Sequence, residues 1–495
     1  MKRPREDEDE DGRRRYCPVP PSRFRALIRD ICAGRYAEED LRKYGPLEDW
    51  DVSRVTDMSG AFSDCVTFNR DLSRWDVSRV RNMSCMFWDA RAFNQPLDGW
   101  DVSQVTEMIY MFGGTHAFNQ PLDGWDVSRV TNMAHMFDGA CAFRQPLGRW
   151  DVSRVRSMRG MFYAATVFVG EGLARWNVGR VEDMAAMFDG ADCFQEPLGR
   201  WDVSRVQNMS RMFRGAYAFN RPLDGWDTGR VTDMSEMFHG ATIFNASLGC
   251  RWNTSRVTNM REMFAYAWAF NQPVGSWDVG QVTNMAGMFA GALVFNRPLG
   301  RWDTRRVTDM AYMFAGARAF DQPLGRWDTG RVTDMSFMFH GAVRFNASLD
   351  GWDTGQVRAM MGMFEVAEAF TGKGLAGWDV GQVRDMHGMF ANAYVFNEPL
   401  GRWNVSRVRD MAWMFSCAYV FHQPLGRWNV RRVESMNGMF FQARAFNHPL
   451  ERWDVSRWTL HAAVPGTEYR IHGADIDIDL LFPNNDYGGG TEAAS

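Results

Sequence analysis

The chain has no marked excess of charge of either sign and no long apolar run. Its 56 basic and 60 acidic residues give a formal net charge of −4 over 495 residues, so no strong overall field attracts nucleic acid or an anionic membrane. Apolar runs extend over only a few residues, too short for a transmembrane helix. The N-terminus mixes basic and acidic residues with no apolar stretch behind them, unlike a secretory signal. We therefore expect an intracellular protein, cytoplasmic or nuclear, without a membrane span.

Cysteine is scarce too, and its eight residues form no regular column. Within the repeat described below they fall at different phases. A disulfide needs Cα atoms within about 7 Å, so this scatter favours free thiols in a reducing compartment. The cysteines are Cys17, Cys32, Cys65, Cys85, Cys141, Cys193, Cys250 and Cys417.

Tryptophan, methionine and phenylalanine are abundant instead, and they recur at fixed intervals. A Trp followed by Asp or Asn recurs from Trp50 to Trp453 every 25 residues, with 26 residues in three places. Each extra residue lies just before Trp176, Trp252 or Trp378, and insertions confined to one segment mark that segment as a loop. The spacing predicts a single solenoid of about sixteen repeats over residues 50–457.

The interior of each unit predicts one short helix and one short strand. With the Trp counted as zero, Met, Met, Phe and Ala stand at +8, +11, +12 and +15, which is the spacing of one helix face. Asp, Asn or Ser at +7 would cap that helix, as over residues 132–143. The Trp-Asp-Val segment, as over residues 125–127, ends in a β-branched residue and predicts a strand that pairs in parallel with its neighbours. The expected fold class is therefore an α/β repeat solenoid.

The ends of the chain differ from the repeats. Phe24, Leu27, Ile28 and Ile31 predict an amphipathic helix that begins near Ser22 and ends by Gly34. We expect a charged disordered tail over 1–21, a helical cap over 22–49, a cap strand region over 458–482 and a flexible tail over 483–495. Aspartates 475, 477 and 479 alternate with isoleucines in that cap region, as in an edge strand that blunts the open end.

The repeat also resembles a known family. The run Trp-Asp-Val-Ser-Arg-Val-Thr-Asn-Met over 125–133, followed by Met136-Phe137, Ala140 and Phe143, is similar to the unit of the BspA-like leucine-rich repeat surface proteins. The resemblance extends from about residue 50 to 455, and the entry segment 23–50 is similar to that of eukaryotic and large-DNA-virus members. The resemblance implies a leucine-rich-repeat-like solenoid. It also implies a candidate role as an adhesin, because bacterial members of the family are often secreted adhesins.

Two polar rows are candidate partner-binding sites, each with a structural alternative. Asp at +1 is replaced by Asn in four units, which favours a hydrogen bond to the following turn over a functional carboxylate array. Arg before the Trp and at +4 has Asp neighbours, which favours solvated ion pairs over a phosphate-binding stripe. The longer units add two further candidates. The candidate residues are Arg149, Asp151, Arg200, Asp202, Arg301, Asp303, Arg326, Asp328, Glu171 and Lys373.

No catalytic or metal-binding motif accompanies these rows. The methionine columns have core spacing, which favours packing over soft-metal binding. The segment 475–486 departs from a calcium loop at its sixth position, Leu480, and its twelfth, Asp486. The basic clusters 2–5 and 13–15 resemble nuclear-import signals, although a solvated tail is the commoner interpretation. We expect no cofactor, no metal and no enzymatic activity.

The sequence thus predicts a monomeric, non-enzymatic scaffold that presents an extended, polar, concave surface to a protein partner of unknown identity. The alternatives are a surface adhesin exported by an unconventional route and a nucleic-acid binder that uses the arginine rows. Nucleic acid is the less favoured of these partners, because tryptophan and phenylalanine are needed in the interior and no aromatic ladder is left for base stacking.

Overall fold

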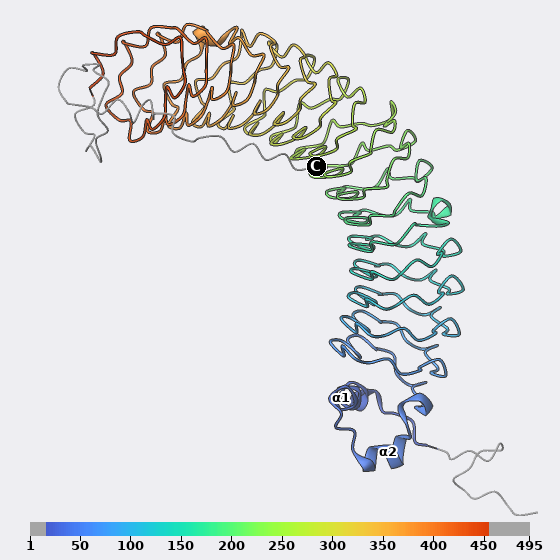
Figure 1. The fold of residues 1–495 in the computed structure, drawn as a ribbon. Coiled ribbons are helices and arrows are strands. Elements are labelled where there is room, and N and C mark those ends of the chain that lie inside the picture. Colours follow the sequence, from blue (N-terminus) through green and yellow to red (C-terminus); the bar gives the residue numbers. More distant parts are fainter. Residues whose placement is uncertain (1–15, 455–495) are drawn as a thin grey trace, which may run out of the picture. The chain divides into compact units, whose positions relative to one another are not determined.

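A computed structural model of the chain describes residues 16–454, and they form a tandem repeat protein. The chain divides into two compact units, Met1–Arg256 and Val257–Ser495. In each unit the backbone winds in successive rungs, one for each sequence repeat, and neighbouring rungs stack on each other (Figure 1). The predicted cap strand region, the calcium-loop-like segment, the C-terminal tail and the basic clusters lie outside the described residues.

The N-terminal cap begins with the predicted helix. Helix α1 spans Pro21–Cys32 and buries Phe24, Leu27 and Ile28. It begins with proline, which suits the first helical position because the amide there has no intrahelical partner. The chain then turns at Gly34 with a φ of 68°. The sequence prediction for this helix, from near Ser22 to Gly34, is confirmed.

Two short elements join this helix to the first repeat. Helix α2 spans Glu38–Tyr44, with acidic residues in its first turn and basic residues in its last, which complements the helix dipole. The 3-10 turn η1, Leu47–Asp49, leads directly into Trp50. Neither element was predicted individually.

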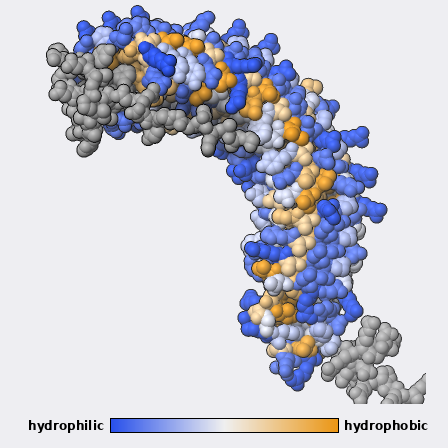
Figure 2. Space-filling view, viewed as in Figure 1, coloured by the Kyte–Doolittle hydropathy of each residue, from blue (hydrophilic) through white to orange (hydrophobic). Residues whose placement is uncertain are grey.

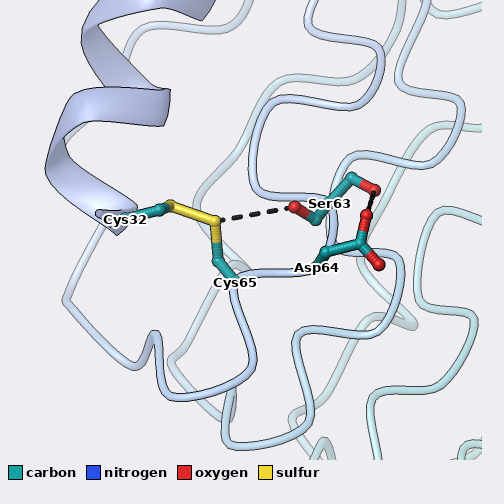
Figure 3. Close-up of a disulfide and its surroundings, with 4 residues drawn as sticks. All are labelled: Cys32, Ser63, Asp64 and Cys65. Atoms are coloured by element: carbon teal, nitrogen blue, oxygen red, sulfur yellow. Dashed lines mark hydrogen bonds between the residues drawn. A yellow bond between two sulfur atoms is a disulfide. The ribbon is translucent and has the colours of Figure 1, made fainter.

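A disulfide joins Cys32, at the end of α1, to Cys65 in the first repeat (Figure 3). Their Cα atoms lie 5.6 Å apart. The expectation of free thiols throughout is therefore wrong for this pair. The prediction compared the positions of the cysteines within the repeat, and such a comparison tests only contacts between rungs. Cys32 lies outside the repeat, on the helix that covers the first rung, so the comparison did not apply to it. Cys17, Cys85, Cys141, Cys193, Cys250 and Cys417 are free.

The segment predicted to be a helix in each unit is instead a run of tight turns. The amides of Met86 and Ala90 donate to carbonyls three residues earlier, at 3.1 and 3.0 Å. The amides of Cys85 and Phe87, on either side of Met86, donate to carbonyls of the next rung at 2.7 and 2.9 Å. An α-helix would direct these amides to carbonyls four residues earlier within the segment. The helix prediction is therefore wrong, as at residues 132–143.

The backbone geometry of the turn run explains why no helix forms. Positions +10 and +14 have positive φ in every unit from Trp50 to Trp428, and a right-handed helix cannot include such residues. Many of these positions are glycine, but Tyr110, His135 and Val366 also have positive φ, of 54°, 57° and 58°. The inward positions +8, +11, +12 and +15 therefore have helical spacing along a chain that is not helical.

The predicted strand on Trp-Asp-Val is also not observed. Within residues 16–454 no extended strand forms, and neighbouring rungs pair through single parallel bridges at +7, as between Asp57 and Asn82. The Trp-Asp-Val segment enters a turn, in which the amide of Val55 donates to the carbonyl of Val52 at 2.8 Å. Parallel stacking of rungs is thus present, but its ladder lies at the residue predicted to be a helix cap.

The core consists of continuous columns of like residues. Met108, Met111 and Phe112 are fully buried, and the same positions are buried along both units. Ring centroids of Phe112 and Phe137 lie 5.6 Å apart with nearly parallel planes, and offset stacking of this kind stabilises aromatic pairs. The prediction that the Met, Phe and Trp columns face a shared interior is confirmed.

The extra residues of the longer units lie in the loop before the Trp, as predicted. In two of these units the loop forms a 3-10 turn: η2, Leu173–Arg175, and η3, Leu375–Gly377. Gly172 and Gly374 precede these turns with φ of 87° and 102°, a conformation that glycine adopts without strain. The turns keep the following Trp in register with the column.

Candidate binding surfaces

The aspartates at +1 are structural. Asp151 Oδ1 accepts a hydrogen bond from the Ser153 amide at 3.0 Å, and Asp202 accepts the same bond from Ser204 at 3.1 Å. Asp303 and Asp328 accept the corresponding amides at 3.3 and 3.1 Å. These bonds confirm the interpretation of the row as turn-forming. Asn177, Asn253, Asn404 and Asn429 accept the same bond.

The predicted arginines have different surroundings. Arg149 pairs with Asp123 of the preceding rung, with Nε 3.4 Å from Oδ2. Arg200 is exposed. Arg301 and Arg326, by contrast, lie together along one groove. The structure thus brings together two of the four predicted arginines.

The groove that contains Arg301 and Arg326 has a volume of about 910 Å³. We call it the first arginine groove. Its repeated lining consists of Pro, Gly and Arg at four, two and one residues before the Trp, and Ser348 and Asp350 also line it. Those repeated residues are Pro298, Gly300, Arg301, Pro323, Gly325 and Arg326.

A similar groove of about 820 Å³ lies on the same face of later rungs. We call it the second arginine groove. Arg402, Arg427 and Arg452 line it, and Glu451 is the one carboxylate among its lining residues. None of these arginines was a predicted candidate, although Arg before Trp was recognised as a recurrent pair.

Glu171 and Lys373 are exposed beside the 3-10 turns of the longer units. The carbonyl of Lys373 accepts the Leu349 amide at 3.1 Å. Glu171 lies in Met1–Arg256 and Lys373 in Val257–Ser495. They therefore remain separate candidates.

A second surface follows the run of turns, and sequence reasoning missed it. We call the side chains at +10 and +13 the turn surface. The neighbouring positions +8 and +12 are Met and Phe in every unit, whereas +10 is Gly, Cys, Tyr, His, Ala, Arg, Glu, Phe or Trp. Treating +8 to +15 as a helix hid this contrast. The variation of residue type at +10, beside the invariant positions +8 and +12, was the sequence signal that could have revealed this surface.

Aromatic side chains are prominent on the turn surface. Trp88 is 42% exposed in the first unit, and Tyr312 and Trp413 are 48% and 38% exposed in the second. Tyr110 stacks on His135 with ring centroids 4.4 Å apart. Figure 2 shows where hydrophobic residues reach the visible face of the molecule, with hydrophilic residues around them. Exposed tyrosine and tryptophan are the residue types enriched in protein interfaces.

A charge cluster occupies the turn surface of the first unit. Arg211 Nη2 lies 3.0 Å from Glu236 Oε1, and Arg214 Nε lies 3.4 Å from Glu236 Oε2. Arg214 Nη1 also lies 3.5 Å from Asp189 Oδ2. Burial raises the pKa of the Asp189 carboxyl from 3.8 to about 6, against the opposing charges of Arg214 and Arg211. The cluster is therefore a fixed polar feature in which burial raises the pKa of the Asp189 carboxyl.

Residues 16–454 contain no group of three or more His, Cys, Asp or Glu side chains placed to hold a metal ion. The methionines at +8 and +11 are buried in the core. None of the helices in this part of the chain is long and apolar enough to cross a membrane.

A family model described as "Mycoplasma protein of unknown function, DUF285" matches the chain five times in tandem, over residues 36–120, 96–172, 167–273, 266–378 and 366–464. The matched residues cover most of the chain. None of the curated proteins compared with the chain matches it.

Solved structures with distant similarity include the TLR13–ssRNA13 complex, with 10% identity and a TM-score of 0.23 over 76% of this chain and 62% of that one. The glycosylated Toll–Spatzle complex of Drosophila has 11% identity and a TM-score of 0.19, over 80% of this chain and 60% of that one. The chain spans about three-fifths of the length of these structures. At TM-scores this low, the whole chains do not superpose.

Proposed function

The chain belongs to the DUF285 family of repeat proteins, and we propose that it is a non-enzymatic scaffold that binds a protein partner through the turn surface. The observation that carries this proposal is the contrast within each repeat. The core positions are constant, whereas the positions at +10 and +13, some of them exposed as at Trp88, Tyr312 and Trp413, vary in size, charge and aromatic character. A frame of this kind can present a different side chain on each rung without altering the packing beneath.

The chemistry of the turn surface suits a protein partner. Tyr312 and Trp413 supply large, exposed, amphipathic contact area, and the Asp189 cluster supplies fixed charge. Aromatic anchors and arginine account for most of the binding energy in many protein interfaces. The proposed scaffold needs no cofactor, and we propose that it acts as a monomer.

Site-specific photo-cross-linking tests the proposal. A photoreactive phenylalanine analogue replaces Tyr312 or Trp413 and, as matched controls on another face of the same rungs, Arg306 or Arg407. In cells of the source organism, we expect a protein adduct of one defined mass from positions 312 and 413 and none from positions 306 and 407. Equal adducts from both faces, or none from either, would contradict the proposal.

The alternative of an exported surface adhesin gains one observation. The Cys32–Cys65 disulfide is of a kind that persists in oxidising compartments and is rare in the cytosol. This supports an exported protein, as in the adhesins of the BspA-like family that the repeat resembles, and counts against the predicted intracellular location. A membrane-impermeant biotin reagent applied to intact cells distinguishes the two: labelling supports the adhesin, and labelling only after lysis supports the intracellular scaffold.

A further inference from the structure

The two residues before each Trp vary, and their two commonest forms differ in charge. Some units have Gly-Arg, as at 401–402 and 426–427, and others have Asp-Gly, as at 123–124. In the Gly-Arg form the first residue has little room. A Cβ on Gly401 would lie 2.8 Å from the carbonyl oxygen of Pro424. Adjacent Gly-Arg rungs therefore leave the floor of the second arginine groove without side chains at Gly401 and Gly426, between prolines and arginines.

The arginines of this groove have no acidic partner among residues 16–454. Arg74 pairs with Asp49 at 3.1 Å, and Arg149 pairs with Asp123, because in both cases an aspartate stands just before the Trp of the preceding rung. Arg402 and Arg427 follow rungs without such an aspartate. Both are exposed, and no described carboxylate forms an ion pair with them or with Arg452. The groove therefore presents a row of three arginines without an ion pair among the described residues, and Glu451 is its one carboxylate.

The spacing of the Trp column next to this row suits an extended peptide. Arg427 and Arg452 directly precede Trp428 and Trp453, whose ring centroids lie 6.4 Å apart with planes 1° from parallel. An extended chain rises about 3.2–3.4 Å per residue, so alternate side chains on one face lie about 6.4–6.8 Å apart. Acidic residues at every second position would meet successive arginines in register.

The chain carries such a segment close to the groove. Asp475, Asp477 and Asp479 alternate with isoleucine and match the three arginines of the groove in number. Only 20 residues separate Asp475 from residue 454, at the last rung of the groove. An extended stretch of that length spans up to about 70 Å, so the linker can reach any of the three arginines. A short tether also gives the segment a high effective concentration at the groove.

We propose that the second arginine groove is a binding site for an extended acidic segment, and that residues 475–479 of the same chain occupy it. Asp475, Asp477 and Asp479 pair with the row of Arg402, Arg427 and Arg452, one carboxylate to each rung. The bound segment covers the basic floor of the groove, and it detaches as salt screens the charges. This proposal does not depend on the turn surface.

Limited proteolysis of the full chain tests the proposal, because trypsin cleaves after Arg470, next to the acidic segment. Mass spectrometry follows the 470–471 bond in the wild type, in R402Q/R427Q and in D475N/D477N/D479N. The matched control is R407Q/R432Q, which removes the same charge from the same rungs on another face. We expect cleavage to be about five-fold faster in both test variants and unchanged in the control. Equal rates in all four proteins would overturn the proposal.

A charge swap separates pairing from a structural effect. R402E/R427E combined with D475K/D477K/D479K should restore the slow cleavage of the 470–471 bond. New cleavage within residues 399–452 would reveal an unfolded variant, and that variant is then replaced by R402K/R427K, which keeps the charge and should stay protected. A labelled peptide of residues 471–482 should bind D475N/D477N/D479N at least ten-fold more tightly than the wild type. Equal binding to both proteins would assign the groove to a separate acidic partner and overturn the intramolecular assignment.

Discussion

The indole Nε1 of Trp125 donates a hydrogen bond of 2.9 Å to the carbonyl oxygen of Leu97, 28 residues earlier in the chain. The same carbonyl also accepts the Trp100 amide at 3.1 Å, so one buried oxygen joins two consecutive rungs. Corresponding bonds recur along both units, as from Trp327 to Leu299 at 3.1 Å. Each Trp therefore fixes the register of its rung by a directional contact as well as by stacking.

We expect Trp125→Phe to lower the free energy of unfolding by about 1–3 kcal/mol, because it removes one buried hydrogen bond and leaves a void beside the Phe column. Urea unfolding followed by circular dichroism measures the change. Trp88→Phe is the control, since Trp88 is 42% exposed. A loss of the same size at both positions would show that the interior bond contributes nothing specific.

The raised pKa of Asp189 makes stability depend on pH. Burial shifts this pKa from 3.8 to about 6, so between these values the folded chain holds a proton that the unfolded chain has released. Stability from this group is therefore complete below about pH 4 and is lost as the pH rises to about 6. The shift of about two pKa units corresponds to about 3 kcal/mol.

We expect Asp189→Asn, which mimics the protonated carboxyl, to unfold like the wild type near pH 4 and to be more stable by up to about 3 kcal/mol above pH 7. Urea midpoints at pH 4, 6 and 7.5 measure this difference. Asp98→Asn makes the same charge change at an exposed position and is the matched control. A constant difference between Asp189→Asn and the wild type at all pH values would contradict the assignment.

Reduction of the Cys32–Cys65 disulfide should destabilise the N-terminal cap. The bond closes a loop with a sequence separation of 33, and loop-closure entropy for that length corresponds to about 3–4 kcal/mol. Hydrogen exchange of α1 amides with and without reductant measures the effect. Cys32→Ser should exchange at the fast rate in both conditions. Equal protection of α1 in the oxidised and reduced wild type would show that the disulfide adds nothing to the cap.

Strain at +14 predicts a stabilising substitution. Val366 has a φ of 58°, whereas the next rung has Asn392 at the same position with a φ of 57°. A β-branched residue is strained in this region, and asparagine tolerates it. We expect Val366→Asn to stabilise the fold by about 1 kcal/mol and Asn392→Val to destabilise it by a similar amount. Thermal unfolding of the two variants checks the opposite signs, and changes of the same sign would exclude strain as the cause.

The sequence predicted the register and the interior of the fold, but not its local backbone. Trp, Met and Phe are so regular that their burial followed from spacing alone. The same spacing, +8, +11, +12 and +15, fits a helix face and a run of turns equally well. Glycine at +10 or +14, as at Gly60, Gly160 and Gly190, was the feature that distinguishes the two structures. A right-handed helix cannot include two left-handed residues four positions apart, whereas glycine adopts that conformation without strain.

The candidate sites were predicted only in part. Arg301 and Arg326 were identified as a row, but their groove depends on the glycine that precedes each arginine and on the proline carbonyl of the next rung, as the close approach of Pro323 O to Gly300 shows. The Asp189 cluster could not be found while its positions were assigned to a helix. The Cys32–Cys65 bond joins a residue outside the repeat to one inside it, so the repeat's own periodicity carried no information about it.

Because the bonds between neighbouring rungs are all of the same kind, the fold does not fix the number of repeats in the solenoid. Trp302 donates its indole NH to the Val274 carbonyl at 3.1 Å, and Trp327 makes the equivalent bond to Leu299. Removal of residues 302–326 would place Trp327 against Val274 with every neighbouring contact of the same kind. Loss or duplication of one 25-residue segment would therefore preserve the contacts between the rungs on either side. The solenoid can thus lose or gain whole rungs without changes elsewhere in the sequence.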